Sequence, residues 1–446
     1  MSMRSLSLTA VLSIALLLSA ACGGSTVDGK SSGTTNRQVS GPIRLAYVVP
    51  DWTALAKALK DPTLDPPKMI VSAKKEFTAL VAWANKNGGV GGRRIEAKPY
   101  TIDQYVTPDQ MTKYCDQMAE DDRREVVIDA SIFTAEQGWQ CMADHKMAYT
   151  GIATATDSTF LKSVAPYIAT TYATIDTQMK ALASLAKTAG FLDGAKVGVL
   201  LTDLPVMHRN YEQAMKPAFA AAGVPAPQVK YITSNDQAQT DNAVLGFKSA
   251  GVSRIFMLTS VVDYLNFSNQ AQSQNYHPRY GFSDYQAMVQ VASQYGSPRQ
   301  NAGAIGVSSV VGPSGIAADA SRVSSDRTSP YEDDQVTPGF KSCMSILSGG
   351  VGTDYMNPGQ AGASTFQASY CDGFMLWLDS ARKIGAGWTP ERFGQGLAAL
   401  GSSYASSRMA SVDFSAGSTG GPVTFGLGEY SAKCKCFVKK LDFMRP

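Results

Sequence analysis

The sequence predicts an α/β protein with parallel sheets that are covered by helices on both faces. Short apolar runs of strand length alternate with segments of helical periodicity along most of the chain. The composition is that of a folded globular protein, with 44% apolar and only 17% charged residues. A chain of 446 residues is too long for one ordinary core, so we expect two domains of typical size.

The first segment of the chain has the features of a cleaved export signal. Arg4 precedes an apolar run from Ala10 to Ala21, which is too short to cross a bilayer, because a helix needs about 20 residues for that. The run leads directly into Cys22 and resembles the bacterial lipoprotein signal, although Ser19 stands where leucine is usual. We expect residues 1–21 to be removed and Cys22 to be lipidated, which anchors the exported protein to the outer face of the cytoplasmic membrane or in the periplasm. Ordinary secretion with a coincidental Cys22 is the alternative.

Residues 22–42 are predicted to be a flexible spacer, because they are rich in Gly, Ser and Thr. The stretch GSTVDGKS (Gly24 to Ser31) matches the phosphate-loop pattern, and GKSSG (Gly29 to Gly33) matches the nucleophile-elbow pattern. Both patterns have meaning only between a strand and a helix, which orient the reacting groups. We therefore assign neither function to the spacer.

The folded body begins with a buried strand and a glycine-rich turn. IRLAYVV (Ile43 to Val49) is the first strand, and apolar residues at helical spacing predict a helix from Ala73 to Asn85. Gly88 and Gly89 end that helix, and the alternating strand RRIEAKPYTID follows. A phosphate cradle requires the order strand, glycines, helix, so this cluster is expected to turn the chain and not to hold a nucleotide.

The alternation continues through the rest of the chain. The further expected strands are REVVIDA (124–130), KMAYTGI (146–152), AKVGVLL (195–201), QVKYITS (228–234), SRIFMLT (253–259) and AIGVSSVV (304–311). Helices are expected between them, for example over 176–189, 211–222 and 241–250. Ligands of parallel sheets bind at the C-terminal ends of the strands, which directs attention to the loops after Ala130, Ile152, Thr259 and Phe282.

Six cysteines beyond Cys22 form an even set in an exported chain, where disulfides persist. The expected pairs are Cys115 with Cys141, Cys343 with Cys371 and, by elimination, Cys434 with Cys436, although a bridge across one residue is strained.

Several function classes find no support in the sequence. There is no CxxC spacing, and His145, His208 and His277 lie far apart in sequence, which argues against a zinc site. The formal net charge is only +3 and no basic stripe marks a nucleic-acid surface. We expect no metal, no cofactor and no nucleic-acid partner.

The order of the pieces resembles the type I periplasmic binding proteins, specifically the branched-chain amino acid (Leu/Ile/Val) binding branch of ABC importers. The most distinctive signature is NKNGGVGGRRIE (85–96). The segments VVIDASIFTAEQ (126–137), YTGIATATDSTF (149–160) and GFKSAGVSRIFML (246–258) follow in the family's order. SYCDGFMLWLDSARKIGA (369–386) and GGPVTFG (420–426) resemble its penultimate helix and closing strand. The resemblance covers nearly the whole chain after the signal.

This resemblance implies two Rossmann-like lobes with parallel sheets, joined by three crossover strands, with a solute trapped between the lobes in the manner of a Venus flytrap. We place lobe 1 at about 43–172 plus 313–408, and lobe 2 at about 173–312 plus 409–446. The segments Lys57 to Lys68 and Gly312 to Pro338 depart from the family pattern, and no role is assigned to either.

The family holds the amino acid's carboxylate with backbone amides and hydroxyls of two loops of lobe 1. The matching positions here are Phe133, Thr134, Thr154, Ala155 and Thr156. Successive N–H groups at a helix start neutralise an anion without a buried counter-charge. The alternative is that the threonines only cap the next helix or turn.

The family's ammonium partner is an acid after a strand of lobe 2, and Asp284 stands at that position; an ordinary solvated loop aspartate is the alternative. Ser260 occupies a position where the family often has tyrosine. The ligand then lacks that hydroxyl contact or is not a standard amino acid. Trp52 and Phe366 are candidates for apolar walls of the site, with plain core or hinge packing as the alternative.

The function implied by the resemblance is that of a monomeric, lipid-anchored solute receptor, not an enzyme. It closes on an amino acid or related small carboxylate and delivers it to an ABC permease. A sensory or scaffold lipoprotein that uses the same closing body without transport is the first alternative. An exported hydrolase is the second, but the histidines offer no recognisable triad.

Overall fold

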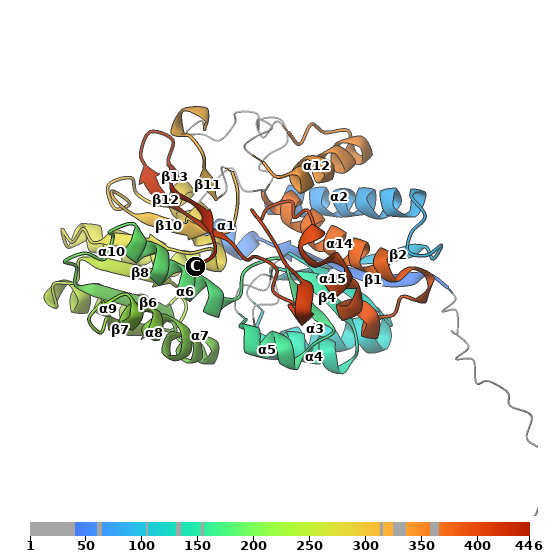
Figure 1. Cartoon of the computed structure of the whole chain (residues 1–446), viewed down its shortest axis with the longest axis horizontal. Coiled ribbons are helices and arrows are strands. Elements are labelled where there is room, and N and C mark those ends of the chain that lie inside the picture. Colours follow the sequence, from blue (N-terminus) through green and yellow to red (C-terminus); the bar gives the residue numbers. More distant parts are fainter. Residues whose placement is uncertain are drawn as a thin grey trace, which may run out of the picture. The chain divides into compact units, whose positions relative to one another are not determined.

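The computed structural model describes residues 41–59, 65–103, 106–130, 135–152, 156–312, 315–323, 336–356 and 365–446. All of them lie within one compact unit, Gln38–Pro446. Two sheets, each with its own helices, make up this unit (Figure 1). The structure therefore has the predicted α/β class with parallel-dominated sheets. No helix among these residues is long and apolar enough to cross a membrane.

The first sheet is entirely parallel and has the strand order β2-β1-β3-β4-β5. Its strands are β1 (Ile43–Asp51), β2 (Ile95–Asp103), β3 (Val126–Asp129), β4 (Ala148–Gly151) and β5 (Ile168–Thr170). Alternate side chains of β1 point into different cores: Leu45 and Tyr47 into one, Ala46 and Val48 into the other. A strand buried on both faces explains why the sequence here is a continuous apolar run.

Helices cover both faces of the first sheet. One face carries α2 (Pro66–Lys86), α12 (Pro338–Val351), α14 (Thr365–Ile384) and α15 (Phe393–Leu400). The other carries α3 (Pro108–Asp116), its π-helical extension η1 (Gln117–Asp121), α4 (Glu136–Asp144) and α5 (Ser158–Ser163). The short α1 (Thr53–Leu59) follows β1 directly.

The second sheet is mixed, with the order β11-β13-β12-β10-β9-β8-β6-β7. Its strands are β6 (Val197–Thr202), β7 (Gln228–Ile232), β8 (Arg254–Leu258), β9 (Arg279–Phe282), β10 (Ile305–Ser308), β11 (Ile316–Ala317), β12 (Phe425–Ser431) and β13 (Cys436–Met444). β12 runs antiparallel to both β10 and β13, so the parallel pattern predicted from the sequence does not extend to this part of the sheet.

Helices also cover both faces of the second sheet. One core contains α6 (Ile175–Thr188) and the run α7 (Pro205–Asn210), η2 (Tyr211–Met215) and α8 (Lys216–Ala221). The other contains α9 (Gln237–Ser249), α10 (Val261–Ser273) and α11 (Met288–Tyr295).

The glycine cluster turns the chain from α2 into β2, as predicted. Gly89 and Gly91 have φ of +59° and +57°, in the left-handed region that favours glycine. A Cβ on Gly91 would lie 2.1 Å from the backbone nitrogen of Ala386, so this turn also needs glycine to let another part of the backbone approach. The cluster joins a helix to the following strand, which is the reverse of the strand–glycine–helix order of a phosphate loop.

The chain passes between the two sheets after β5, between β11 and α12, and between α15 and β12. Backbone hydrogen bonds join these passages, for example from Val311 N to Arg408 O at 2.9 Å and from Thr170 N to Thr419 O at 2.8 Å. Two short stretches lie on the other side of the predicted lobe boundaries. Ile316–Ala317 belongs to the second sheet, and Val412 and Phe414 pack in the first lobe's core.

Candidate ligand-binding site

Only some of the predicted site residues lie in the described part of the chain. Phe133, Thr134, Thr154 and Ala155 lie outside the described residues, as do the side chain of Phe366 and Cys22. The remaining four, Trp52, Thr156, Ser260 and Asp284, follow strands β1, β4, β8 and β9. They occupy the C-terminal ends of parallel strands, where α/β sheets bind ligands.

Thr156 is fully buried, and no described residue lies within hydrogen-bonding distance of its Oγ1. Helix α5 is capped by the next residue, Asp157, whose carboxylate accepts from the Phe160 amide at 2.8 Å. The capping alternative therefore does not account for the Thr156 hydroxyl. A buried hydroxyl without a partner costs about 1–3 kcal/mol, which a polar ligand group would offset.

Asp284 is only 3% exposed, so it is not a solvated loop residue. Its carboxylate accepts hydrogen bonds from the hydroxyl of Ser308 and from the amide and hydroxyl of Ser309, the latter two at 2.8 and 2.9 Å. Burial raises the pKa of Asp284, and these bonds together with the Arg408 guanidinium oppose the shift. Because β10 ends at Ser308, this carboxylate lies where the chain leaves the second sheet.

A second buried carboxylate and a buried guanidinium lie near Asp284. Arg408 is 5% exposed, donates to Ser369 Oγ at 2.7 Å and lies 5.1 Å from the ring centroid of Tyr172. Burial raises the pKa of Asp372, again opposed by hydrogen bonds and by Arg408. We call Asp284, Asp372 and Arg408 the hinge cluster. With both acids ionised it carries one net negative charge.

The hinge cluster was only partly found from the sequence. Arg408 and Asp372 lie in segments whose pattern gives no sign of an ionic role, and they come together only because the passage between α15 and β12 packs on α14, where Ser406 and Ser407 donate to the Asp372 carboxylate. Asp284 alone had a signal, its place after a strand of the second sheet.

Ser260 has a structural role that accounts for its bonding, and Trp52 is buried. Ser260 caps α10: its Oγ accepts from the amide of Asp263 at 3.2 Å and donates to that residue's carboxylate at 2.6 Å. Trp52 is 5% exposed directly after β1. A ligand contact from either residue stays a prediction.

Arg209 of α7 joins the two lobes directly. Its guanidinium donates to Asp157 Oδ2 at 2.6 Å and pairs with Glu136 of α4, and Asn210 Nδ2 donates to Asp157 at 2.9 Å. Burial alone would raise the pKa of Asp157, but bonds from Phe160, Asn210 and Arg209 hold it below its usual value. No local pattern predicts this contact, because its partners belong to different lobes.

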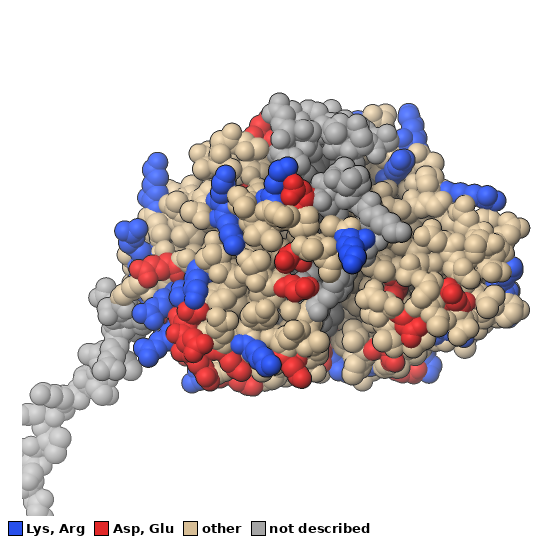
Figure 2. Space-filling model, turned by 180° about the vertical axis from the view of Figure 1, so that it is seen from behind, with Lys and Arg blue, Asp and Glu red and all other residues tan. Residues whose placement is uncertain are grey.

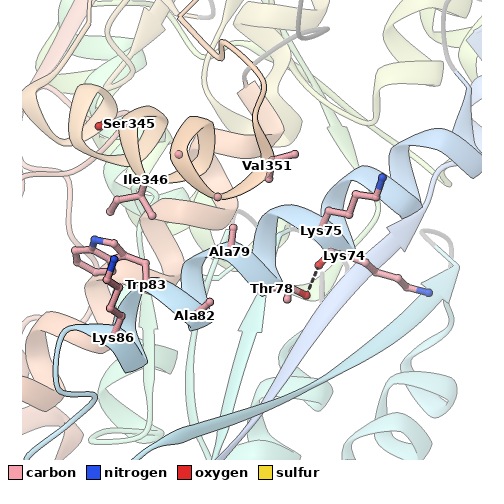
Figure 3. A pocket seen from close by; sticks show the side chains of 12 residues that line it. Lys74, Lys75, Thr78, Ala79, Ala82, Trp83, Lys86, Ser345, Ile346 and Val351 are labelled. Atoms are coloured by element: carbon pink, nitrogen blue, oxygen red, sulfur yellow. Dashed lines mark hydrogen bonds between the residues drawn. The ribbon is translucent and has the colours of Figure 1, made fainter.

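A groove of about 980 Å³ lies elsewhere, between α2 and α12 (Figure 3). Trp83 and Ile346 face each other across one end of it, and Lys74, Lys75 and Lys86 line it from α2. It is formed by two helices on one face of the first sheet and includes none of the residues at the strand ends. We therefore do not assign the solute to it.

The surface charges are mixed. Figure 2 shows basic and acidic side chains interspersed over the described part of one face, so neither sign dominates there.

Comparison with known proteins agrees with this architecture. The family model described as "Periplasmic binding protein" matches residues 71–329. No curated protein matches the sequence.

Three solved structures of similar fold are distant in sequence. A branched-chain amino acid ABC transporter protein from Thermus thermophilus with bound valine has a TM-score of 0.65 at 15% identity, covering 91% of this chain and 98% of its own. A solute-binding protein from R. palustris in complex with benzoate has a TM-score of 0.61 at 13% identity, covering 91% and 98%. A substrate-binding protein from Streptococcus pneumoniae in complex with isoleucine has a TM-score of 0.60 at 13% identity, covering 91% and 100%.

Proposed function

The chain belongs to the periplasmic binding protein family, and from that premise we propose that it is the extracytoplasmic solute receptor of an ABC importer. It closes on a small carboxylate, with an amino acid as the leading candidate, and delivers it to a membrane permease. The observation that carries this proposal is the pair of α/β lobes joined by three passages, with buried polar groups at the strand ends.

The ligand class is inferred from the polar groups of the site. The relatives of similar fold are complexes with valine, isoleucine and benzoate, all of which contain a carboxylate. The unpartnered hydroxyl of Thr156 and the predicted amides of Phe133, Thr134, Thr154 and Ala155 suit that group. The hinge cluster, with two carboxyl groups and one guanidinium, suits an ammonium group, because a buried ammonium needs an acidic partner to avoid a cost of several kcal/mol. Together they favour an amino acid over an aromatic acid.

We attribute closure of the two lobes to contacts that join them. A ligand that contacts both lobes has a higher affinity for the closed form than for the open form, and this difference shifts the equilibrium toward the closed form. The bonds from Arg209 to Asp157 and Glu136 also stabilise the closed form, because they join the two lobes. A lipid on Cys22 would keep the receptor at the membrane where the permease lies.

A thermal-shift panel with valine, isoleucine, leucine, benzoate and 4-hydroxybenzoate tests the ligand class. Ligand at 100 times its dissociation constant adds about 2.7 kcal/mol to the free energy of unfolding. We expect amino acids to raise the melting temperature, and Asp284→Asn to abolish that rise because the ammonium loses its counter-charge. The matched control is Asp319→Asn, an exposed acid in the 315–323 segment.

Two results would contradict the assignment. If the aromatic acids stabilise the protein and the amino acids do not, the ligand class is wrong. If Asp284→Asn keeps the full response to valine, the ammonium partner is a different residue.

A further inference from the structure

Helices α3 and α4 bring together four side chains that can bind a metal ion. Cys115 and Asp116 form the end of α3, while Cys141 and His145 lie four residues apart, at the end of α4. One donor atom from each residue lies within 4.8 Å of all the others. We call these four residues the α3–α4 cluster. It has no part in the proposed solute site, which lies at the strand ends.

No sequence pattern indicates this cluster, because its members come from two segments. The histidines lie far apart in sequence and no CxxC spacing exists, which argued against a zinc site. The packing of α3 on α4 supplies the missing ligands, with one cysteine from each helix. Two thiolates, an imidazole and a carboxylate form a ligand set that suits Zn²⁺.

Two distances in the α3–α4 cluster match those of a tetrahedral zinc site, and one distance is an exception. Zn–S bonds of about 2.3 Å and Zn–N or Zn–O bonds of about 2.0–2.1 Å place an oxygen about 3.3 Å from a nitrogen and about 3.6 Å from a sulfur. Asp116 Oδ1 lies 3.2 Å from His145 Nε2 and 3.5 Å from Cys141 Sγ. The exception is the two sulfur atoms, which form a disulfide at 2.12 Å where zinc requires about 3.8 Å.

We propose that Cys115, Asp116, Cys141 and His145 form a zinc site that the Cys115–Cys141 disulfide masks. A dithiol, free or on a thiol–disulfide exchange protein, opens the site by reducing the disulfide and is itself oxidised to a disulfide. The S–S bond breaks and each sulfur takes up one proton. Zn²⁺ then binds both thiolates and displaces those two protons. The same two helices are thus joined either by a covalent bond or by a metal ion.

The exposure of the cluster allows this exchange. Cys115 is fully buried, so a reductant has to attack the sulfur of Cys141, which is 9% exposed. The His145 and Asp116 side chains are 30% and 46% exposed, so reductant and metal approach from the side of His145. Within the described residues, neither the Cys343–Cys371 pair nor the Cys434–Cys436 pair belongs to such a group. These two pairs serve as internal controls.

Cobalt provides the test, because Co²⁺ replaces Zn²⁺ and its absorption reports a four-coordinate site with thiolate ligands. The chain carrying Cys22→Ser, which removes the one cysteine outside the three pairs, is reduced with a phosphine and titrated with Co²⁺. We expect one Co²⁺ per chain, intense visible absorption, and loss of that absorption when Zn²⁺ is added. His145→Ala should weaken binding by more than about 100-fold, since even residues behind the ligands cost 10- to 100-fold.

The controls separate metal ligation from folding. His145→Ala keeps the Cys115–Cys141 disulfide when oxidised, so an unchanged melting temperature of the oxidised variant shows that it folds. Asp116→Asn is a second ligand variant, tested in the same way. His277→Ala and the pair Cys343→Ala/Cys371→Ala should bind cobalt as the parent chain does. The proposal is overturned if the reduced chain gives no such absorption, if His145→Ala and Asp116→Asn bind as tightly as the parent, or if the oxidised chain binds Co²⁺ equally well.

Discussion

At the scale of single residues, the site is distinguished by polar groups that are buried at the ends of strands. Thr156 has no partner for its hydroxyl among the described residues, while Asp284 has three donors and a raised pKa. Both positions were predicted from the family pattern; the burial of Asp284 excludes the solvated-loop alternative, and Asp157, not Thr156, caps α5. Arg408 and Asp372 were not predicted, because a single charged residue, whether in an irregular segment like Arg408 or in a helix like Asp372 of α14, carries no sign of its burial.

Thr156→Val tests whether the unpartnered hydroxyl serves the ligand. Valine has nearly the same shape, so the ligand-free variant should be as stable as the parent or more stable, because it buries no unpaired polar atom. Affinity for the solute should fall by about 0.5–1.5 kcal/mol, roughly two- to tenfold in dissociation constant. Calorimetric titration and urea unfolding measure the two quantities. Unchanged affinity, or a clear loss of ligand-free stability, would show that the hydroxyl is structural.

At the scale of elements, strands were predicted well where both of their faces are buried. β1, β3, β6 and β8 fall on the apolar runs identified in the sequence, because burial on two faces requires nearly every residue to be apolar. β11 has only two residues, too few for any periodic signal, and the boundary between the lobes was consequently placed before it. The antiparallel direction of β12 depends on tertiary pairing, which no local pattern records.

The glycine turn between α2 and β2 gives a prediction at this scale. Gly91→Ala adds a methyl group that meets the backbone at Ala386 and also strains a positive φ, so it should lower the free energy of unfolding by about 2–5 kcal/mol. Gly92→Ala is the matched control: its φ is +85°, but the space around it is open, so only the strain of about 1–2 kcal/mol remains. Equal losses in the two variants would mean that the close approach to Ala386 has no importance for stability.

At the scale of the whole molecule, two lobes and three passages were predicted through the order of the segments, since no single motif determines them. The contacts between the lobes were not predictable in the same way. Arg209 pairs with Asp157 and Glu136 across a sequence separation of 52 and 73 residues, and nothing near it in the sequence marks its partner. Such long-range ionic contacts depend on how the two folded lobes pack against each other.

Small-angle X-ray scattering with and without valine, or with the solute that the thermal-shift panel identifies, tests the central claim most directly. We expect saturating solute to reduce the radius of gyration as the lobes close. We also expect Arg209→Met to be more extended than the parent without solute, and to approach the parent's compact form when solute is added. If bound solute leaves the scattering of the parent and of Arg209→Met unchanged, the lobes do not close on a guest and the proposed receptor mechanism is wrong.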